Sequence, residues 1–224
     1  MTDFRAQRIN MVDSQVRPNG ITNRRIIAAM GEVPREEFVA ETLRTVAYAD
    51  ADLLIKPASS SSPARYLMAP MALARLLQLA EIPETGKVLL IGCATGYACA
   101  VLARLCHTVI AVEDDLELLT GARSRMTAMK IGNAAVYPGR HSAGRSADAP
   151  YDVIIAGGRI AEVPAPLPAQ LKDHGRLVAV VGESEMARAT VITRRGANVS
   201  ARGAFDLAVA PLPGFEIKRP AFVF

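Results

Sequence analysis

Two glycines and one acidic residue have the types and spacing of a nucleoside-binding site. Gly92 and Gly96 lie between an aliphatic run and a helical pattern, and Glu113 follows Gly92 at about the 20-residue spacing of such sites. Glycines at a strand-to-helix turn let the backbone approach a ligand closely, and an acid ending the next strand accepts hydrogen bonds from ribose hydroxyls. We therefore expect a nucleoside here, although a tight turn beside a solvated carboxylate has the same spacing.

The elements around these residues alternate between strands and helices. Short apolar runs typical of buried strands are followed by helical spacing, and this βαβ alternation predicts an α/β fold with a doubly wound, mostly parallel sheet. The last two predicted strands are expected to form a C-terminal β-hairpin. The predicted strands are 87–91, 108–113, 135–137, 152–156, 175–181, 190–193 and 204–209, and the predicted helices between them are 98–106 and 119–129.

The N-terminal part of the chain has a helical pattern without an obvious strand. Thr22 is the expected N-cap of a helix that Pro34 ends, and Pro70 opens a strongly apolar helix that continues to Ala80. Residues 53–65 contain two prolines and a run of serines and have neither helical nor strand periodicity. They are expected to form an exposed, mobile loop.

The pattern is that of a single domain over residues 1–224. Within it, residues 1–82 are expected to form a helical lead-in with an active-site loop, and residues 83–224 a nucleotide-binding α/β core. Half of the residues are apolar, which is enough for a sizeable core and excludes disorder as the main state.

Composition also limits the partners and the location. No apolar run reaches the roughly 18 to 20 residues of a membrane helix, and the N-terminus has no signal-like segment, so a cytoplasmic protein without membrane contact is expected. The net charge of +4 comes from dispersed residues, which disfavours a nucleic-acid partner. Cys93, Cys99 and Cys106 lack metal-ligand spacing, and no metal is expected. The sequence does not indicate an oligomeric state.

The full pattern around the turn is more specific than its glycines. The segment 88–103, VLLIGCATGYACAVLA, resembles the first motif of S-adenosylmethionine-dependent methyltransferases. Together with MVDSQVR at 11–17, VPREEFV at 33–39, APYDVII at 149–155 and GRLV at 175–178, it is similar to the protein-L-isoaspartate O-methyltransferase family. The resemblance implies a Rossmann-like methyltransferase fold and esterification of damaged aspartyl residues in proteins, which then revert through a succinimide.

The resemblance also implies a cofactor and its binding residues. S-adenosyl-L-methionine is the expected cofactor, and proteins or peptides with isoaspartyl residues are the expected partners. The expected cofactor-binding residues are Gly92, Cys93, Ala94, Gly96, Glu113, Arg140 and His141.

The sequence departs from the family pattern at positions that are catalytic or cofactor-binding in the family. The family's catalytic Gln-Thr-Ile-Ser-Gln-Pro stretch falls on residues 65–70, so Met68 occupies the position of its serine and no catalytic residue is assigned. The family's Gly-Asp-Gly is replaced by Gly139-Arg140-His141 in this chain. The family's aspartate accepts a hydrogen bond from the adenine amino group, whereas Arg140 can only donate, so weak cofactor binding is expected. The chain is therefore expected to be a methyltransferase of weakened activity, or alternatively a catalytically inactive binding or regulatory protein on the same scaffold.

Overall fold

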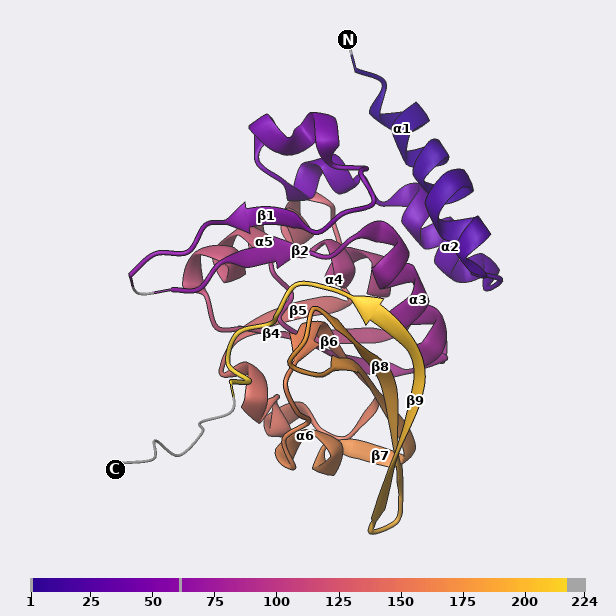
Figure 1. Ribbon diagram of the computed structural model, residues 1–224, viewed down its shortest axis with the longest axis vertical. Helices are drawn as coiled ribbons and strands as arrows, with labels where there is room; N and C mark the ends of the chain where they lie inside the picture. The colour runs from indigo at the N-terminus through magenta and orange to yellow at the C-terminus, as the bar shows by residue number, and fades with distance from the viewer. Residues whose placement is uncertain (1, 61, 217–224) are drawn as a thin grey trace.

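The computed structural model of the protein describes residues 2–60 and 62–216. Its core is a seven-stranded sheet in the order β5-β4-β3-β6-β7-β8-β9, in which β5 to β7 are parallel and β8 and β9 are antiparallel to their neighbours. The strands are β3 (Lys87–Ile91), β4 (Thr108–Glu113), β5 (Ala134–Pro138), β6 (Tyr151–Ile160), β7 (Leu171–Val181), β8 (Met186–Arg195) and β9 (Asn198–Ala208). The predicted mostly parallel sheet and C-terminal hairpin are confirmed, with longer hairpin strands than expected (Figure 1).

The helices lie mainly before the sheet in sequence and between its first strands. They are α1 (Phe4–Met11), the π-helical turn Val12–Val16, α2 (Arg24–Glu32), α3 (Pro70–Ala80), α4 (Tyr97–Leu102), α5 (Leu116–Ala128) and α6 (Pro166–Ala169), with 3-10 turns at Arg17–Asn19, Arg35–Phe38, Glu41–Val46, His141–Ala143 and Ser146–Asp148. Among the described residues, no helix has the length and apolar character needed to cross a lipid bilayer.

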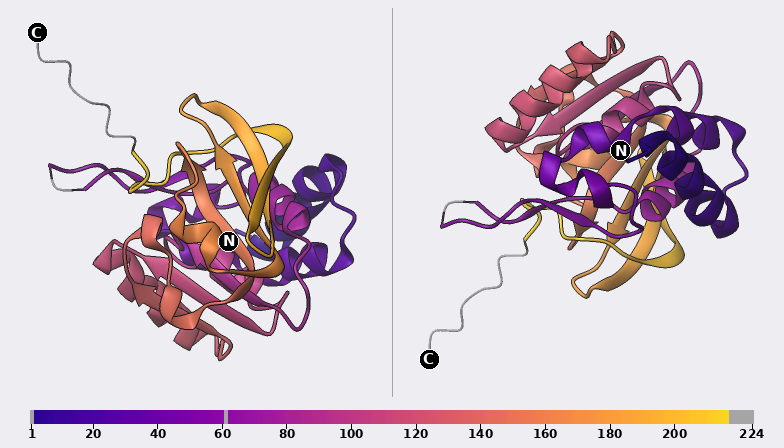
Figure 2. Two further views of the ribbon diagram at one scale, coloured as in Figure 1. Left: turned by 90° about the horizontal axis from the view of Figure 1, so that it is seen from below. Right: turned by 90° about the horizontal axis from the view of Figure 1, so that it is seen from above.

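Both faces of the central strands are buried, because alternate residues face two different apolar clusters. Leu90 belongs to the cluster made with α3, α4, α5 and the N-terminal helices, whereas Leu89 belongs to the cluster made with α6 and the segment after β9. The N-terminal helices therefore cover one face, and the chain's last described residues return to the other (Figure 2).

Two local predictions for the N-terminal part are wrong. Within residues 53–65, β1 (Leu53–Lys56) pairs antiparallel with β2 (Arg65–Leu67), because Leu53 and Leu67 face each other and are both buried. The turn-forming residues occupy only the tip, of which residue 61 lies outside the described residues. The N-cap of α2 is Asn23, whose side chain accepts a hydrogen bond from the Arg25 amide, and not Thr22. Residues 217–224 of the predicted domain also lie outside the description.

Candidate functional site

The Gly92–Gly96 turn joins β3 to α4 at the carboxyl edge of the sheet. Gly92 (φ +73°) and Gly96 (φ +100°) adopt backbone conformations that favour glycine, and Ala94 adopts one at φ +51°. The Thr95 hydroxyl in this turn is buried and has no hydrogen-bond partner among the described residues. A buried polar atom without a partner is unusual, so the turn has hydrogen-bonding capacity that a ligand can use.

Glu113, at the end of β4, is the buried acid that the sequence assigns to the ribose. Its carboxylate accepts hydrogen bonds from the backbone amides of Ala94 (2.8 Å), Asp114 (3.1 Å) and Asp115 (3.2 Å). Burial by itself raises the pKa of Glu113, but His141 and Arg65 outweigh burial and lower it to about 2. Glu113 is thus in direct contact with the Gly92–Gly96 turn.

Arg65, the first residue of β2, already occupies both oxygens of this carboxylate. Its Nη1 donates to Glu113 Oε1 at 2.6 Å and its Nη2 to Oε2 at 2.8 Å, and Nη1 also contacts Asp114 at 3.0 Å. The Arg65 side chain is only 5% exposed. This bidentate pair places a cation where ribose hydroxyls would bind, and sequence reasoning missed it.

The two residues expected at the adenine, Arg140 and His141, differ in burial. His141 is buried, with Nδ1 2.9 Å from the Pro213 carbonyl oxygen and Nε2 3.5 Å from Glu113 Oε1, whereas Arg140 is exposed. Glu113, Asp114 and His141 offer ligand atoms within 4.8 Å of one another, as a cation site would. The cation paired with both carboxylates, however, is the Arg65 guanidinium.

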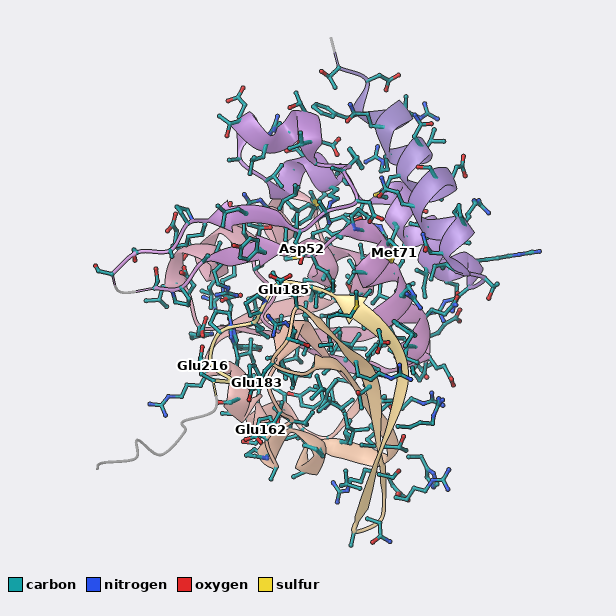
Figure 3. All side chains as sticks on the ribbon, viewed as in Figure 1. Asp52, Met71, Glu162, Glu183, Glu185 and Glu216 are labelled. Atoms are coloured by element: carbon teal, nitrogen blue, oxygen red, sulfur yellow. The ribbon has the colours of Figure 1, made fainter. Side chains whose placement is uncertain are left out.

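The segment after β9, residues 210–216, crosses the carboxyl edge of the sheet and covers the turn (Figure 1). Leu212 packs directly against Gly92, since a Cβ built there would lie 2.4 Å from Leu212 Cδ1. Asp52, labelled in Figure 3, fixes this segment by accepting a hydrogen bond from the Ala210 amide. The space above the first glycine is therefore filled by the chain itself.

The cavities beside the turn are too small for a nucleoside. Those that border Gly92 and Ala94 measure about 10 and 20 Å³, whereas small-molecule sites typically measure about 300 to 1,000 Å³. A larger cavity of about 520 Å³ lies outside them and shares Tyr66 and Leu212 with the smaller one. Glu183 and Glu216, labelled in Figure 3, also line it. In this conformation the space beside Glu113 is occupied by Arg65 and Leu212.

The stretch at 65–70 leads from β2 into α3 and borders both kinds of cavity. Met68 is buried, and its carbonyl oxygen accepts a hydrogen bond from Arg35 Nη2 at 2.8 Å. Tyr66 is half-buried and faces the larger cavity. Cys93 in the turn is buried, which raises the pKa of its thiol well above the ordinary value and disfavours the thiolate.

Replacing Ala94 with glycine is expected to stabilise the fold. An alanine at positive φ costs roughly 1 kcal/mol, and glycine removes this strain at the expense of some unfolded-state entropy, so a net gain of about 0.5 kcal/mol is expected. Urea denaturation measures it. Ala98→Gly, inside α4, is the matched control and is expected to lose about 1 kcal/mol. An equal loss in Ala94→Gly would contradict the assigned strain.

Comparison with known proteins places the chain in a family. A sequence model described as protein-L-isoaspartate(D-aspartate) O-methyltransferase (PCMT) matches residues 7–214. The chain belongs to the protein-L-isoaspartate(D-aspartate) O-methyltransferase family. A family relative from Koribacter versatilis, named protein-L-isoaspartate O-methyltransferase, is 34% identical over 99% of this chain and 97% of its own. One from Pelobacter propionicus, protein-L-isoaspartate O-methyltransferase 2, is 37% identical over 83% and 80%.

Solved structures of the family share the fold. A protein-L-isoaspartate O-methyltransferase superposes with a TM-score of 0.82 at 22% identity, covering 93% of this chain and 67% of that one. A Plasmodium falciparum structure described as a beta-aspartate methyltransferase (PCMT), in complex with S-adenosyl-L-homocysteine, has a TM-score of 0.74 at 17% identity and covers 96% and 100%. The predicted methyltransferase fold is confirmed.

Proposed function

We propose that this chain is an S-adenosylmethionine-dependent carboxyl methyltransferase that acts on L-isoaspartyl residues of proteins, the activity for which its relatives are named. The observation that carries the proposal is Glu113, which ends β4 in contact with the Gly92–Gly96 turn, inside a family match that spans residues 7–214. A cytoplasmic location and the exclusion of nucleic-acid partners stay predictions.

The residues proposed to hold the cofactor come from the ends of two adjacent strands. Glu113 offers two carboxylate oxygens for ribose hydroxyls, Gly92 and Gly96 allow close approach, and the Thr95 hydroxyl is available for a hydrogen bond. When bound, the cofactor supplies a methyl group on a positively charged sulfur. The roles of Cys93, Ala94, Arg140 and His141 in binding stay predictions, and Arg140 is exposed in this conformation.

The chain's contribution to methyl transfer is orientation. An isoaspartyl carboxylate is ionised at neutral pH, so its oxygen attacks the methyl carbon without a general base. The protein would have to orient that carboxylate oxygen toward the methyl group that the cofactor would supply. Met68 offers no hydroxyl for this purpose. The 520 Å³ cavity bordered by Tyr66 is the proposed approach for the acceptor.

Methyl-ester formation on two peptides that differ only in an isoaspartyl or aspartyl residue tests the proposal. We expect slow transfer to the isoaspartyl peptide and none to the aspartyl control. The triple change Tyr66→Thr, Met68→Ser and Arg140→Asp is expected to raise the rate at least tenfold, a gain of about 1.4 kcal/mol in transition-state stabilisation. No transfer by either protein would contradict the proposed activity and favour an inactive binding protein.

A further inference from the structure

The chain's own side chains fill the two places that a nucleoside needs. Arg65 occupies the ribose acceptor Glu113, and Leu212 occupies the space above Gly92. We propose that Arg65 and Leu212 form a latch that closes the cofactor site and must open before a nucleoside binds. This inference rests on the proposed function, because it concerns the same cofactor site.

Arg65 occupies the same acceptor atoms of Glu113 that ribose hydroxyls would use. Two parallel N–H groups of its guanidinium donate to the two carboxylate oxygens at 2.6 and 2.8 Å, just as a pair of ribose hydroxyls would. The two sets of donors compete for the same lone pairs. The apparent association constant for a nucleoside is therefore the intrinsic constant multiplied by the fraction of molecules in which Arg65 has left Glu113. Arg65 keeps a second partner when it leaves, because Asp114 lies 3.0 Å away and its side chain is 34% exposed.

Leu212 is held in place by the backbone of its segment. The Leu212 amide donates to the Arg159 carbonyl oxygen at 2.7 Å, and the next carbonyl, that of Pro213, lies 2.9 Å from His141 Nδ1. Leu212 nevertheless borders the 520 Å³ cavity on its other side. The Leu212 side chain can therefore leave Gly92 by moving into existing space.

Asp52 connects the two parts of the latch. One of its carboxylate oxygens accepts from the Ala210 amide, and the other accepts from the Ala69 amide at 2.7 Å, where β2 leads into α3. The hairpin that carries Arg65 and the segment that carries Leu212 are thereby joined through one side chain. Displacement of one is expected to loosen the other.

Calorimetric titration with S-adenosylhomocysteine tests the latch on the full chain. We expect Arg65→Gln to bind at least tenfold more tightly than wild type, with Arg65→Lys between them because lysine lacks the bidentate geometry. Lys56→Gln is the matched control, since Lys56 is in the same hairpin and pairs with the neighbouring Asp115 at 2.6 Å, and its affinity is expected to equal that of wild type. Equal or weaker binding by folded Arg65→Gln would overturn the latch.

Two further measurements do not depend on the Arg65 variants. Leu212→Ala is expected to bind S-adenosylhomocysteine more tightly than wild type, and unchanged affinity would contradict the role of Leu212. In wild type, saturating S-adenosylhomocysteine is expected to accelerate amide hydrogen exchange in residues 210–216, whereas a ligand that entered without displacement would slow it.

The outcomes separate the latch from the proposed activity. Tight binding by Arg65→Gln without methyl transfer supports the latch and contradicts the methyltransferase function. Methyl transfer by wild type with equal affinities in all variants supports the function and overturns the latch. If no folded variant binds the nucleoside, both are overturned.

Discussion

The Glu113→Gln variant is expected to lose about 3 kcal/mol of unfolding free energy at pH 7. The change leaves the Arg65 guanidinium, 5% exposed, without its bidentate carboxylate, and breaking one side of a buried ion pair typically costs about 3–5 kcal/mol. The lower value applies because Asp114 remains 3.0 Å from the same guanidinium. Urea denaturation followed by circular dichroism measures the loss.

A second substitution and a surface control show whether the loss comes from the pair. Adding Arg65→Met to Glu113→Gln removes the unpaired charge and is expected to restore most of the stability. Glu117→Gln, which removes an exposed carboxylate that pairs with Lys56, is expected to change stability by less than about 0.5 kcal/mol. A double variant as unstable as the single one would show that the stability comes from another role of Glu113.

The Arg65–Glu113 ion pair also makes the stability loss of Glu113→Gln depend on pH. Because Arg65 and His141 hold the pKa of Glu113 at about 2, below its ordinary 4.5, its stabilisation is complete above pH 4.5 and disappears as the pH falls toward 2. The stability difference between wild type and Glu113→Gln is therefore expected to shrink across this range. A difference that stays constant from pH 6 to pH 2.5 would contradict the assignment.

The Gly157→Ala variant is expected to lose about 3 kcal/mol or more. A Cβ at Gly157 would lie 2.2 Å from the carbonyl oxygen of Gly92 and 3.0 Å from that of Ile91. Both are backbone atoms of the adjacent strand and its turn, so no side-chain rotation relieves the contact, and overpacking of this kind costs about 1–3 kcal/mol or more. Thermal melting and urea denaturation measure the effect.

Gly132→Ala is the matched control for this substitution. A Cβ at Gly132 meets nothing within 4 Å among the described residues, so the change is expected to alter stability by less than about 1 kcal/mol. If Gly157→Ala has the same melting temperature as wild type, the β3 and β6 backbones can separate at the turn at little cost in free energy, contrary to the packing described.

Much of the sheet could be predicted because its central strands have strong local patterns. Residues 88–91 form a continuous apolar run since both faces of β3 are buried, and Glu113 ends a strand of the same kind. The hairpin β1–β2 could not be predicted because its strands are short and their pairing depends on contacts with distant elements. Pro57 and the serines that follow it are typical of a loop, so the short strand directly before them was assigned to the same loop.

The candidate site was predicted only in its local part. The sequence pattern assigned the Gly92–Gly96 turn and Glu113 to one site, and the structure places the Ala94 amide 2.8 Å from the Glu113 carboxylate. Arg65 lies 48 residues before Glu113 and has no periodic relation to it, so only the fold brings them together. A single signal was present, since Arg65 is a charged residue within an otherwise uncharged stretch before α3.

The return of residues 210–216 across the sheet also has a consequence for biosynthesis. The Gly92–Gly96 turn and Glu113 leave the ribosome well before Leu212, and β3 and β4 can pair once β4 has emerged. For part of translation, the carboxyl edge of the sheet thus lacks its C-terminal cover. A chain that ends before residue 210 therefore lacks the Leu212 side chain over Gly92 but already contains Arg65, which precedes Glu113 in the sequence.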